Sequence, residues 1–134
     1  SEQRLSLPLV RAIVAALAIA TGSALSGCVV AAAAAAAAGA VAYLKGELNA
    51  TLQEDVTDVA RATDRAIVEM RFFVVSNKTD AVSGEFIMRN AKDERITIKL
   101  TRTGEGLTKV QIRVGMLGDE ELSRSILDAI KRNL

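Results

Sequence analysis

The alternation of apolar and polar residues changes period several times after residue 41. Between Ala42 and Leu52 the even positions are apolar or glycine, and the odd positions are polar or amphipathic. Strict alternation over this length is typical of a strand with one face buried. The pattern therefore predicts one half-buried strand at the start of the folded region.

The next segment has a helical period. Its apolar or small residues recur every three or four positions and form one stripe of a helix. These are Val56, Val59, Ala60, Thr63, Ile67 and Met70. Asp55 stands where an N-cap is expected, and Asp58 adds a second acid to the positive first turn. We predict a helix that begins after Asp55.

Four further strands are predicted. The run Phe72–Val75 is apolar on both faces, which favours a central strand. Alternation returns over residues 82–89, 95–101 and 109–114, with turns at 90–94 and 104–106. Asp119 then caps a last helix, whose stripe is Leu122, Ile126, Ala129 and Ile130.

The expected fold class is α+β, with the element order β-α-β-β-β-β-α over residues 41–134. Short loops make the middle strands an antiparallel meander. Both helices are apolar on one side only, so they are expected to cover one face of a sheet of about five strands. This two-layer arrangement resembles the helix-grip fold, a likeness that says nothing of function.

The pattern of the N-terminal segment indicates an export signal. Arg4 and Arg11 precede an apolar run over residues 12–20, and small residues follow at 21–23. A basic stretch, a short apolar core and a small-residue exit are the layout of a secretory signal peptide. The apolar run is shorter than the roughly 20 residues of an independent transmembrane helix.

The end of this segment, Leu25-Ser26-Gly27-Cys28, resembles the bacterial lipobox. The resemblance implies peptidase recognition of Leu25, Ser26 and Gly27, cleavage before Cys28 and acylation of that cysteine, which would tether the protein to a membrane. Residues 1–27 would then be a lipoprotein signal peptide. Val29 stands where an aspartate would signal inner-membrane retention, so we expect an outer-membrane anchor facing the periplasm. The alternative is that Cys28 is a buried apolar residue of a core or membrane helix.

Residues 28–40 form an alanine-rich linker, with eight consecutive alanines at 31–38. One interpretation is a spacer at the membrane surface. Another is a small-residue helix that enters the bilayer and associates with a second copy. A third is an uncleaved span over residues 12–44. The oligomeric state is left open.

Composition excludes several kinds of chemistry. The chain has no histidine and one cysteine, so it cannot build a Ser-His-Asp or Cys-His nucleophile or an internal disulfide. A transition-metal site would need carboxylates alone, so we expect no metal and no cofactor. The net charge of +1 gives no reason to expect nucleic-acid binding. Without Arg4, Arg11 and Glu2, residues 28–134 are balanced in formal charge.

Residues 28–134 resemble a family of small bacterial lipoproteins of unknown function. The matching pieces are the alanine-rich tail after Cys28, Tyr43–Leu48, Ile96–Leu100 and, most specifically, Ile112–Ser123. The unbroken alanines depart from the more glycine-rich tails of such proteins. The resemblance implies no catalytic residues.

The sheet face opposite the helices is the candidate site. It is expected to carry five bases that could meet an anionic lipid headgroup, lipopolysaccharide or an acidic protein: Arg89, Arg95, Lys99, Lys109 and Arg113. The alternative is an ordinary solvated face whose bases discourage edge pairing. The acid pairs Asp55/Asp58 and Glu120/Glu121 fit helix capping better than acid–base catalysis.

These observations favour a non-enzymatic envelope lipoprotein that acts as a tethered binding or assembly module. Two alternatives remain. One is a carboxylate-dependent enzyme acting on a cell-wall or lipid substrate. The other is a small integral membrane protein that self-associates through its alanine helix.

Overall fold

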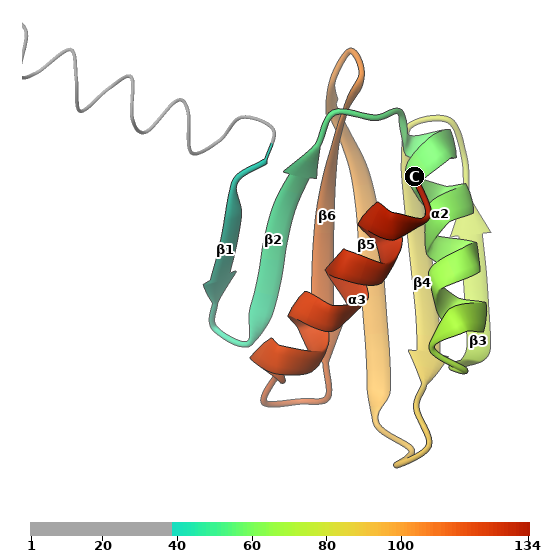
Figure 1. Cartoon of the computed structure of the whole chain (residues 1–134), viewed down its shortest axis with the longest axis vertical. Coiled ribbons are helices and arrows are strands. Elements are labelled where there is room, and N and C mark those ends of the chain that lie inside the picture. The colour runs from blue at the N-terminus through green and yellow to red at the C-terminus, as the bar shows by residue number, and fades with distance from the viewer. Residues whose placement is uncertain (1–38) are drawn as a thin grey trace, which may run out of the picture. The chain divides into compact units, whose positions relative to one another are not determined.

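A computed structural model describes residues 39–134, which form an open antiparallel sheet with two helices (Figure 1). The elements in chain order are β1 (Val41–Leu44), β2 (Glu47–Leu52), α2 (Val56–Glu69), β3 (Phe73–Thr79), β4 (Ser83–Arg89), β5 (Arg95–Gly104), β6 (Leu107–Val114) and α3 (Glu120–Arg132). The predicted α+β class is confirmed. Within residues 39–134 the sheet has six strands rather than about five.

The extra strand comes from the segment predicted as one strand over residues 42–52. It is a hairpin, because Lys45 and Gly46 both adopt positive φ, 53° and 79°, and turn the chain back on itself. Tyr43 pairs with Leu48, so the turn reverses the parity of the buried positions. In β1 the odd residues face the core and Leu44 is 67% exposed, whereas in β2 the even residues are buried.

The sheet order is β1-β2-β6-β5-β4-β3. The prediction that Phe72–Val75 is a central strand was wrong, because β3 lies at an edge of the described sheet and, among residues 39–134, pairs only with β4. Its apolar residues Phe73, Val74 and Val75 are 55–67% exposed. The register also shifts between Val74 and Ser76, so β3 does not keep a buried side in regular alternation.

One face of the sheet packs against both helices (Figure 1). The core is built from alternate residues of β2, β4, β5 and β6, such as Leu48, Phe86, Ile98 and Ile112, all 0% exposed. The predicted stripe of α2 is buried from Val56 to Ile67, and that of α3 from Ile126 to Ile130. Gly84, Phe86 and Met88 face inward as predicted, but Val82 lies in the turn before β4 and is 54% exposed.

The two helix starts differ in how they are capped. Asp119 adopts an extended conformation and its Oδ1 accepts a hydrogen bond from the Leu122 amide at 3.0 Å, as an N-cap should. Asp55 occupies the N-cap position of α2, but its side chain makes no capping bond. Its carbonyl oxygen instead accepts from the amides of Asp58 and Val59. Capping by side chain is therefore observed at α3 and not at α2.

Candidate functional site

The candidate lipid-attachment motif, Leu25 to Cys28, and the alanine tract lie outside residues 39–134, so the geometry concerns the sheet face alone. No helix within 39–134 has the length and apolar character needed to cross a bilayer.

The structure places all five predicted bases on the sheet face that carries no helix, which we call the open face. Arg89 lies on β4, Arg95 and Lys99 on β5, and Lys109 and Arg113 on β6. Each alternates with buried neighbours, so each points away from the core. Cross-strand pairing puts Arg89 beside Arg95 and sets the other bases opposite Thr97, Gln111 and Thr101.

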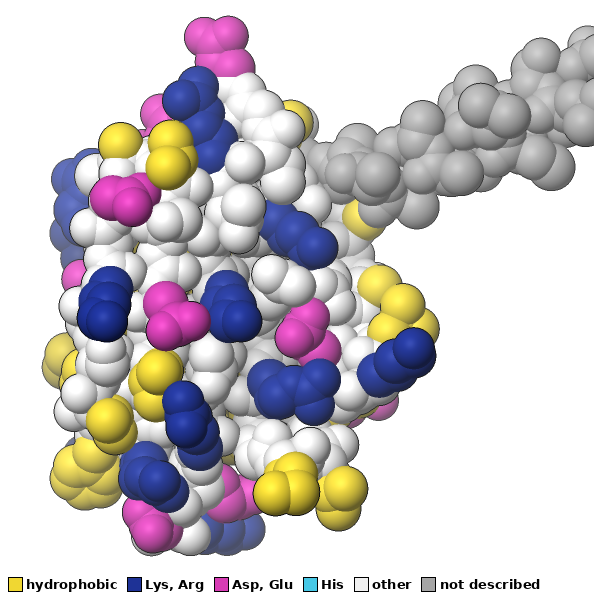
Figure 2. Space-filling view, turned by 180° about the vertical axis from the view of Figure 1, so that it is seen from behind, with side chains coloured by type: hydrophobic (Ala, Val, Ile, Leu, Met, Phe, Trp, Pro, Cys, Tyr) yellow, Lys and Arg dark blue, Asp and Glu magenta, His cyan; other side chains and the backbone are white. Residues whose placement is uncertain are grey.

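Acids are interleaved with these bases. In the strand register, Glu47 of β2 lies opposite Arg113 of β6. Glu85 of β4 lies between Lys99 of β5 and Lys78 of β3. Figure 2 shows the result, with basic and acidic side chains mixed across the open face. The face is therefore not a uniform basic field, and any attraction for an anion must be local.

Arg113 is held in place by its neighbours. Its Nη2 donates to the Lys45 carbonyl oxygen at 3.1 Å, and its Nε lies 4.0 Å from a Glu47 carboxylate oxygen. Gln111 donates to the other Glu47 oxygen at 3.0 Å. These contacts tie β6 to the β1–β2 hairpin, so Arg113 and Glu47 both have structural partners.

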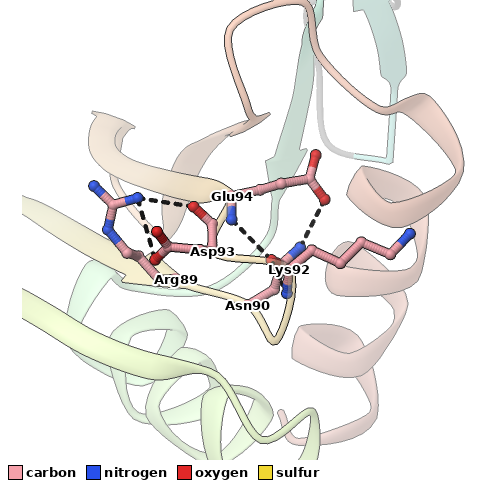
Figure 3. Close-up of polar contacts among 5 residues, drawn as sticks. All are labelled: Arg89, Asn90, Lys92, Asp93 and Glu94. Atoms are coloured by element: carbon pink, nitrogen blue, oxygen red, sulfur yellow. Dashed lines mark hydrogen bonds and ion pairs between the residues drawn. The ribbon is translucent and has the colours of Figure 1, made fainter.

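Arg89 belongs to the turn between β4 and β5 (Figure 3). Its Nη1 donates to the Asp93 carbonyl oxygen at 2.8 Å and lies 3.5 Å from the Asp93 carboxylate. Asn90 Oδ1 accepts from the amides of Lys92 and Glu94, each at 3.0 Å, and Asn90 Nδ2 donates to Glu94 Oε1 at 3.0 Å. Arg89 therefore closes a turn whose conformation is fixed by the Asn90 side chain. The hydrogen bond from Asn90 to Glu94 orients the Glu94 side chain.

The open face is hollowed between β2, β6, β5 and β4. The depression has a volume of about 730 Å³, and three acids and three bases line it: Glu47, Glu85, Glu94, Arg95, Lys99 and Arg113. Ile87, Thr97 and Gln111 supply further lining, and Met116 lies at one end. Three of the five predicted bases thus meet in one place, while Arg89 and Lys109 do not line it. Sequence reasoning missed Glu94, whose position depends on the turn that Asn90 fixes.

A second depression, of about 690 Å³, shares Glu85 and Lys99 with the first and extends to β3. At its rim Asp80 Oδ1 accepts hydrogen bonds from the amides of Val82 and Ser83, each at 2.8 Å. These two bonds, with a further one from the Ser83 hydroxyl, lower the pKa of Asp80. Asp80 thus has a structural role in the turn between β3 and β4.

The bases that remain available are Arg95, Lys99 and Lys109. None of them forms an ion pair with another residue in the range 39–134, whereas Arg89 and Arg113 both do. In the same range, no three Asp or Glu side chains lie close enough together to hold a metal ion. Of these three, Arg95 and Lys99 line the depression, so they offer one guanidinium and one ammonium group to an anionic group that enters it.

A family model described as a protein of unknown function (DUF3568) matches residues 11–133. The chain belongs to this family. Membership confirms the resemblance at the level of a family without established function, while the lipobox and a bacterial origin stay predictions. No curated protein matches the chain.

The DUF3568 match begins before Leu25 and ends within one residue of the end of α3. It therefore spans the candidate lipobox, the alanine tract and the whole described sheet. The family description assigns no chemistry to the open face.

Proposed function

We propose that this protein is a membrane-tethered envelope lipoprotein whose folded region is a non-enzymatic binding or assembly module. The observation that carries the proposal is the hollowed open face, where Arg95 and Lys99 line one depression without an ion-pair partner among residues 39–134. Thr97 and Gln111 beside them add neutral hydrogen-bonding groups. This combination suits a carboxylate or phosphate group of a partner.

The partner is expected to be an acidic protein segment or an anionic lipid headgroup. The acids among the bases limit the attraction to a short range. The partner must therefore place its negative charge between Glu47 on β2 and Glu85 on β4. A diffuse polyanion would meet these acids at the same time and gain little. The proposal is therefore one of local complementarity rather than of a general basic surface.

Several described acids have structural roles, which supports binding over catalysis. Asp119 caps α3, Asp80 fixes the turn before β4, and Glu69 accepts hydrogen bonds from Arg132 and Asn133. The enzyme alternative rests on the three carboxylates of the depression, Glu47, Glu85 and Glu94, of which Glu47 and Glu94 already accept hydrogen bonds from neighbouring amides.

Tethering is the second half of the proposal, and it rests on Leu25 to Cys28 together with the preceding basic and apolar segment. More than one acyl chain on Cys28 would hold the protein stably on the outer membrane, facing the periplasm. Mass spectrometry of the membrane fraction should find acylated Cys28 and no residues 1–27. A chain that keeps residues 1–27, or that stays in the membrane after Cys28→Ser, would favour the integral-membrane alternative.

The binding half is tested by site-specific photo-crosslinking in the native envelope. A photoreactive residue in place of Gln111, inside the depression, should give a discrete product that disappears in the Lys99→Glu chain and weakens as ionic strength rises. The matched control places the same probe at Lys131, an exposed lysine of α3 on the helix side. Equal products from both positions, or a product insensitive to Lys99→Glu, would refute a role for the open face.

A further inference from the structure

The loop between β6 and α3 carries two large apolar side chains in water. Met116 is 92% exposed and Leu117 is 91% exposed, more than the other large hydrophobic residues in the described part of the chain. We call these two side chains the apolar tip. A single exposed leucine is ordinary, but two neighbours that protrude together on one loop suggest a surface that something covers.

The backbone below the apolar tip is held tightly. Gly115 and Gly118 flank it with φ of +66° and +84°. A Cβ on Gly118 would lie 2.5 Å from the Gly46 carbonyl oxygen, and one on Gly46 would lie 2.7 Å from the Leu117 carbonyl oxygen. The backbone of the loop thus packs directly against the backbone of the β1–β2 turn. This close packing fixes the position of the segment that carries Met116 and Leu117.

From this placement we propose that the apolar tip inserts into the interfacial layer of a zwitterionic phospholipid bilayer. Two side chains bury far less than the roughly 1,000 Å² that a specific protein interface needs, so a second copy or another folded protein would gain too little. A bilayer needs no complementary surface, and it accepts a convex apolar group.

The charges near the tip decide the kind of bilayer. Lys45 and Arg113 lie beside the β1–β2 turn, and Arg113 is bonded to the Lys45 carbonyl oxygen. Asp119, Glu120 and Glu121 begin α3 immediately after the loop. Bases and acids therefore both lie in the segments next to the tip, and Arg124 pairs with Glu120. A strongly anionic surface would attract the bases and repel the acids. A zwitterionic surface leaves the apolar side chains to determine binding.

The length of the preceding chain is compatible with this contact. The chain runs from Gly39 through β1 to Leu44, beside the loop that carries the tip (Figure 1). At about 3.3 Å per residue, that is roughly 17 Å along the strand. Ten residues separate Cys28 from Gly39, and the eleven Cα-to-Cα steps between them span up to about 39 Å when extended. A lipid on Cys28, which belongs to the proposed function, and the tip can therefore reach the same bilayer, and the tether would raise the effective concentration of a weak contact.

The full sequence contains no tryptophan, which allows a single reporter to be introduced. The full chain with Leu117→Trp is reconstituted into phosphatidylcholine vesicles, with and without brominated acyl chains. We expect brominated lipid to quench its fluorescence at least twofold and its emission to shift to shorter wavelength. The matched control is Val82→Trp, on the turn between β3 and β4 at the other end of the strands, where we expect less than a fifth of that quenching.

Met116→Ser added to the Leu117→Trp chain should reduce the quenching, because it removes half of the apolar tip. Equal quenching in the Leu117→Trp and Val82→Trp chains, or none in either, would overturn the proposal. So would shielding of the Leu117→Trp reporter from aqueous iodide without quenching by lipid, since that result indicates that a second copy of the chain covers the loop. The readout is local to the loop, so it is independent of whether mass spectrometry finds an acyl group on Cys28.

Discussion

Buried hydroxyl groups in this domain differ in whether they have a hydrogen-bond partner. Thr63 Oγ1 donates to the Val59 carbonyl oxygen at 2.7 Å, and Thr108 Oγ1 donates to the Glu54 carbonyl oxygen at the same distance. Ser123, also 0% exposed, has no partner for its Oγ among residues 39–134. A buried hydroxyl without a hydrogen bond has a desolvation cost that nothing offsets.

Ser123→Ala should therefore stabilise the protein. Removing the unpartnered hydroxyl is expected to raise the free energy of unfolding by about 1 kcal/mol, helped by the higher helix propensity of alanine. Urea unfolding followed by circular dichroism measures the change. The control is Ser125→Ala on the same helix, an exposed serine whose Oγ bonds to the Glu121 carbonyl oxygen, where a change below about 0.5 kcal/mol is expected. A destabilised Ser123→Ala chain would show that the hydroxyl has a partner after all.

Two exposed carboxylates make stability depend on pH. A hydrogen bond from Arg132, with a second from Asn133, lowers the pKa of Glu69 below its ordinary 4.5. The amides of Val82 and Ser83 lower the pKa of Asp80 below its ordinary 3.8. A lowered folded-state pKa gives stability that is present above the unfolded value and is lost as pH falls through the folded one.

We therefore expect the urea midpoint to be flat from pH 7 down to the ordinary pKa values of 4.5 and 3.8, and to fall below them. Glu69→Gln combined with Asp80→Asn should flatten that acidic limb relative to the parent. The pair Glu54→Gln and Asp64→Asn is the comparison, because it removes the same formal charge without touching Glu69 or Asp80. An acidic limb equally steep in both double variants would contradict the assignment.

At the scale of elements, two turns that are distant in sequence pack against each other: the β1–β2 turn and the loop after β6. Gly118→Ala should disrupt this contact, because its Cβ would collide with the Tyr43 hydroxyl and with the backbone of Gly46. Positive φ and the collision together are expected to cost about 3 kcal/mol or more. Gly106→Ala separates the two effects, since Gly106 has φ of +64° but nothing within 4 Å. It should cost only about 1 kcal/mol by chemical denaturation. Equal losses would show that the close packing does not matter.

Elements with a clean period were predictable, and those whose identity depends on a distant partner were not. Phe86, Ile98 and Ile112 follow the alternation of their strands, and these side chains lie on the buried face that the alternation predicts. The Lys45-Gly46 turn was missed because the alternation continues through it and because lysine seldom adopts positive φ. Phe73 to Val75 resembles a central strand in composition, and only the neighbour that β3 lacks makes it an edge.

The same division applies to the candidate site. Side-chain alternation was enough to place Arg95, Lys99 and Arg113 on one face. It could not show that Arg89 closes a turn by binding Asp93, because that contact requires the turn geometry that Asn90 and the positive φ of Asp93 create. Glu94 enters the depression for the same reason, through its bond to Asn90. Partners that depend on a loop conformation are outside what periodicity can predict.

At the scale of the whole molecule, a single core joins both helices to the sheet, and residues 37–134 form one compact unit. Removing residues 1–36 should therefore leave the free energy of unfolding within about 0.5 kcal/mol of the full chain, measured in the same buffer and detergent. Removing residues 1–44 is the contrasting deletion. It takes away β1 and Tyr43, which packs against the core, and should lower the urea midpoint clearly. A 37–134 fragment that fails to unfold cooperatively would contradict this prediction.

The sheet order has a consequence for how the domain is assembled as the chain emerges during synthesis. β3 to β6 pair with their neighbours in sequence, but β2 pairs with β6. The contact between Glu47 and Arg113 therefore cannot form until β6 has been made. Closing such a long loop is slow compared with forming the meander. The β1–β2 hairpin emerges first and docks last, and until then Leu48 and Leu52 have no core to cover them. Of the six described strands, the first two to be made are therefore the last to have their apolar side chains covered.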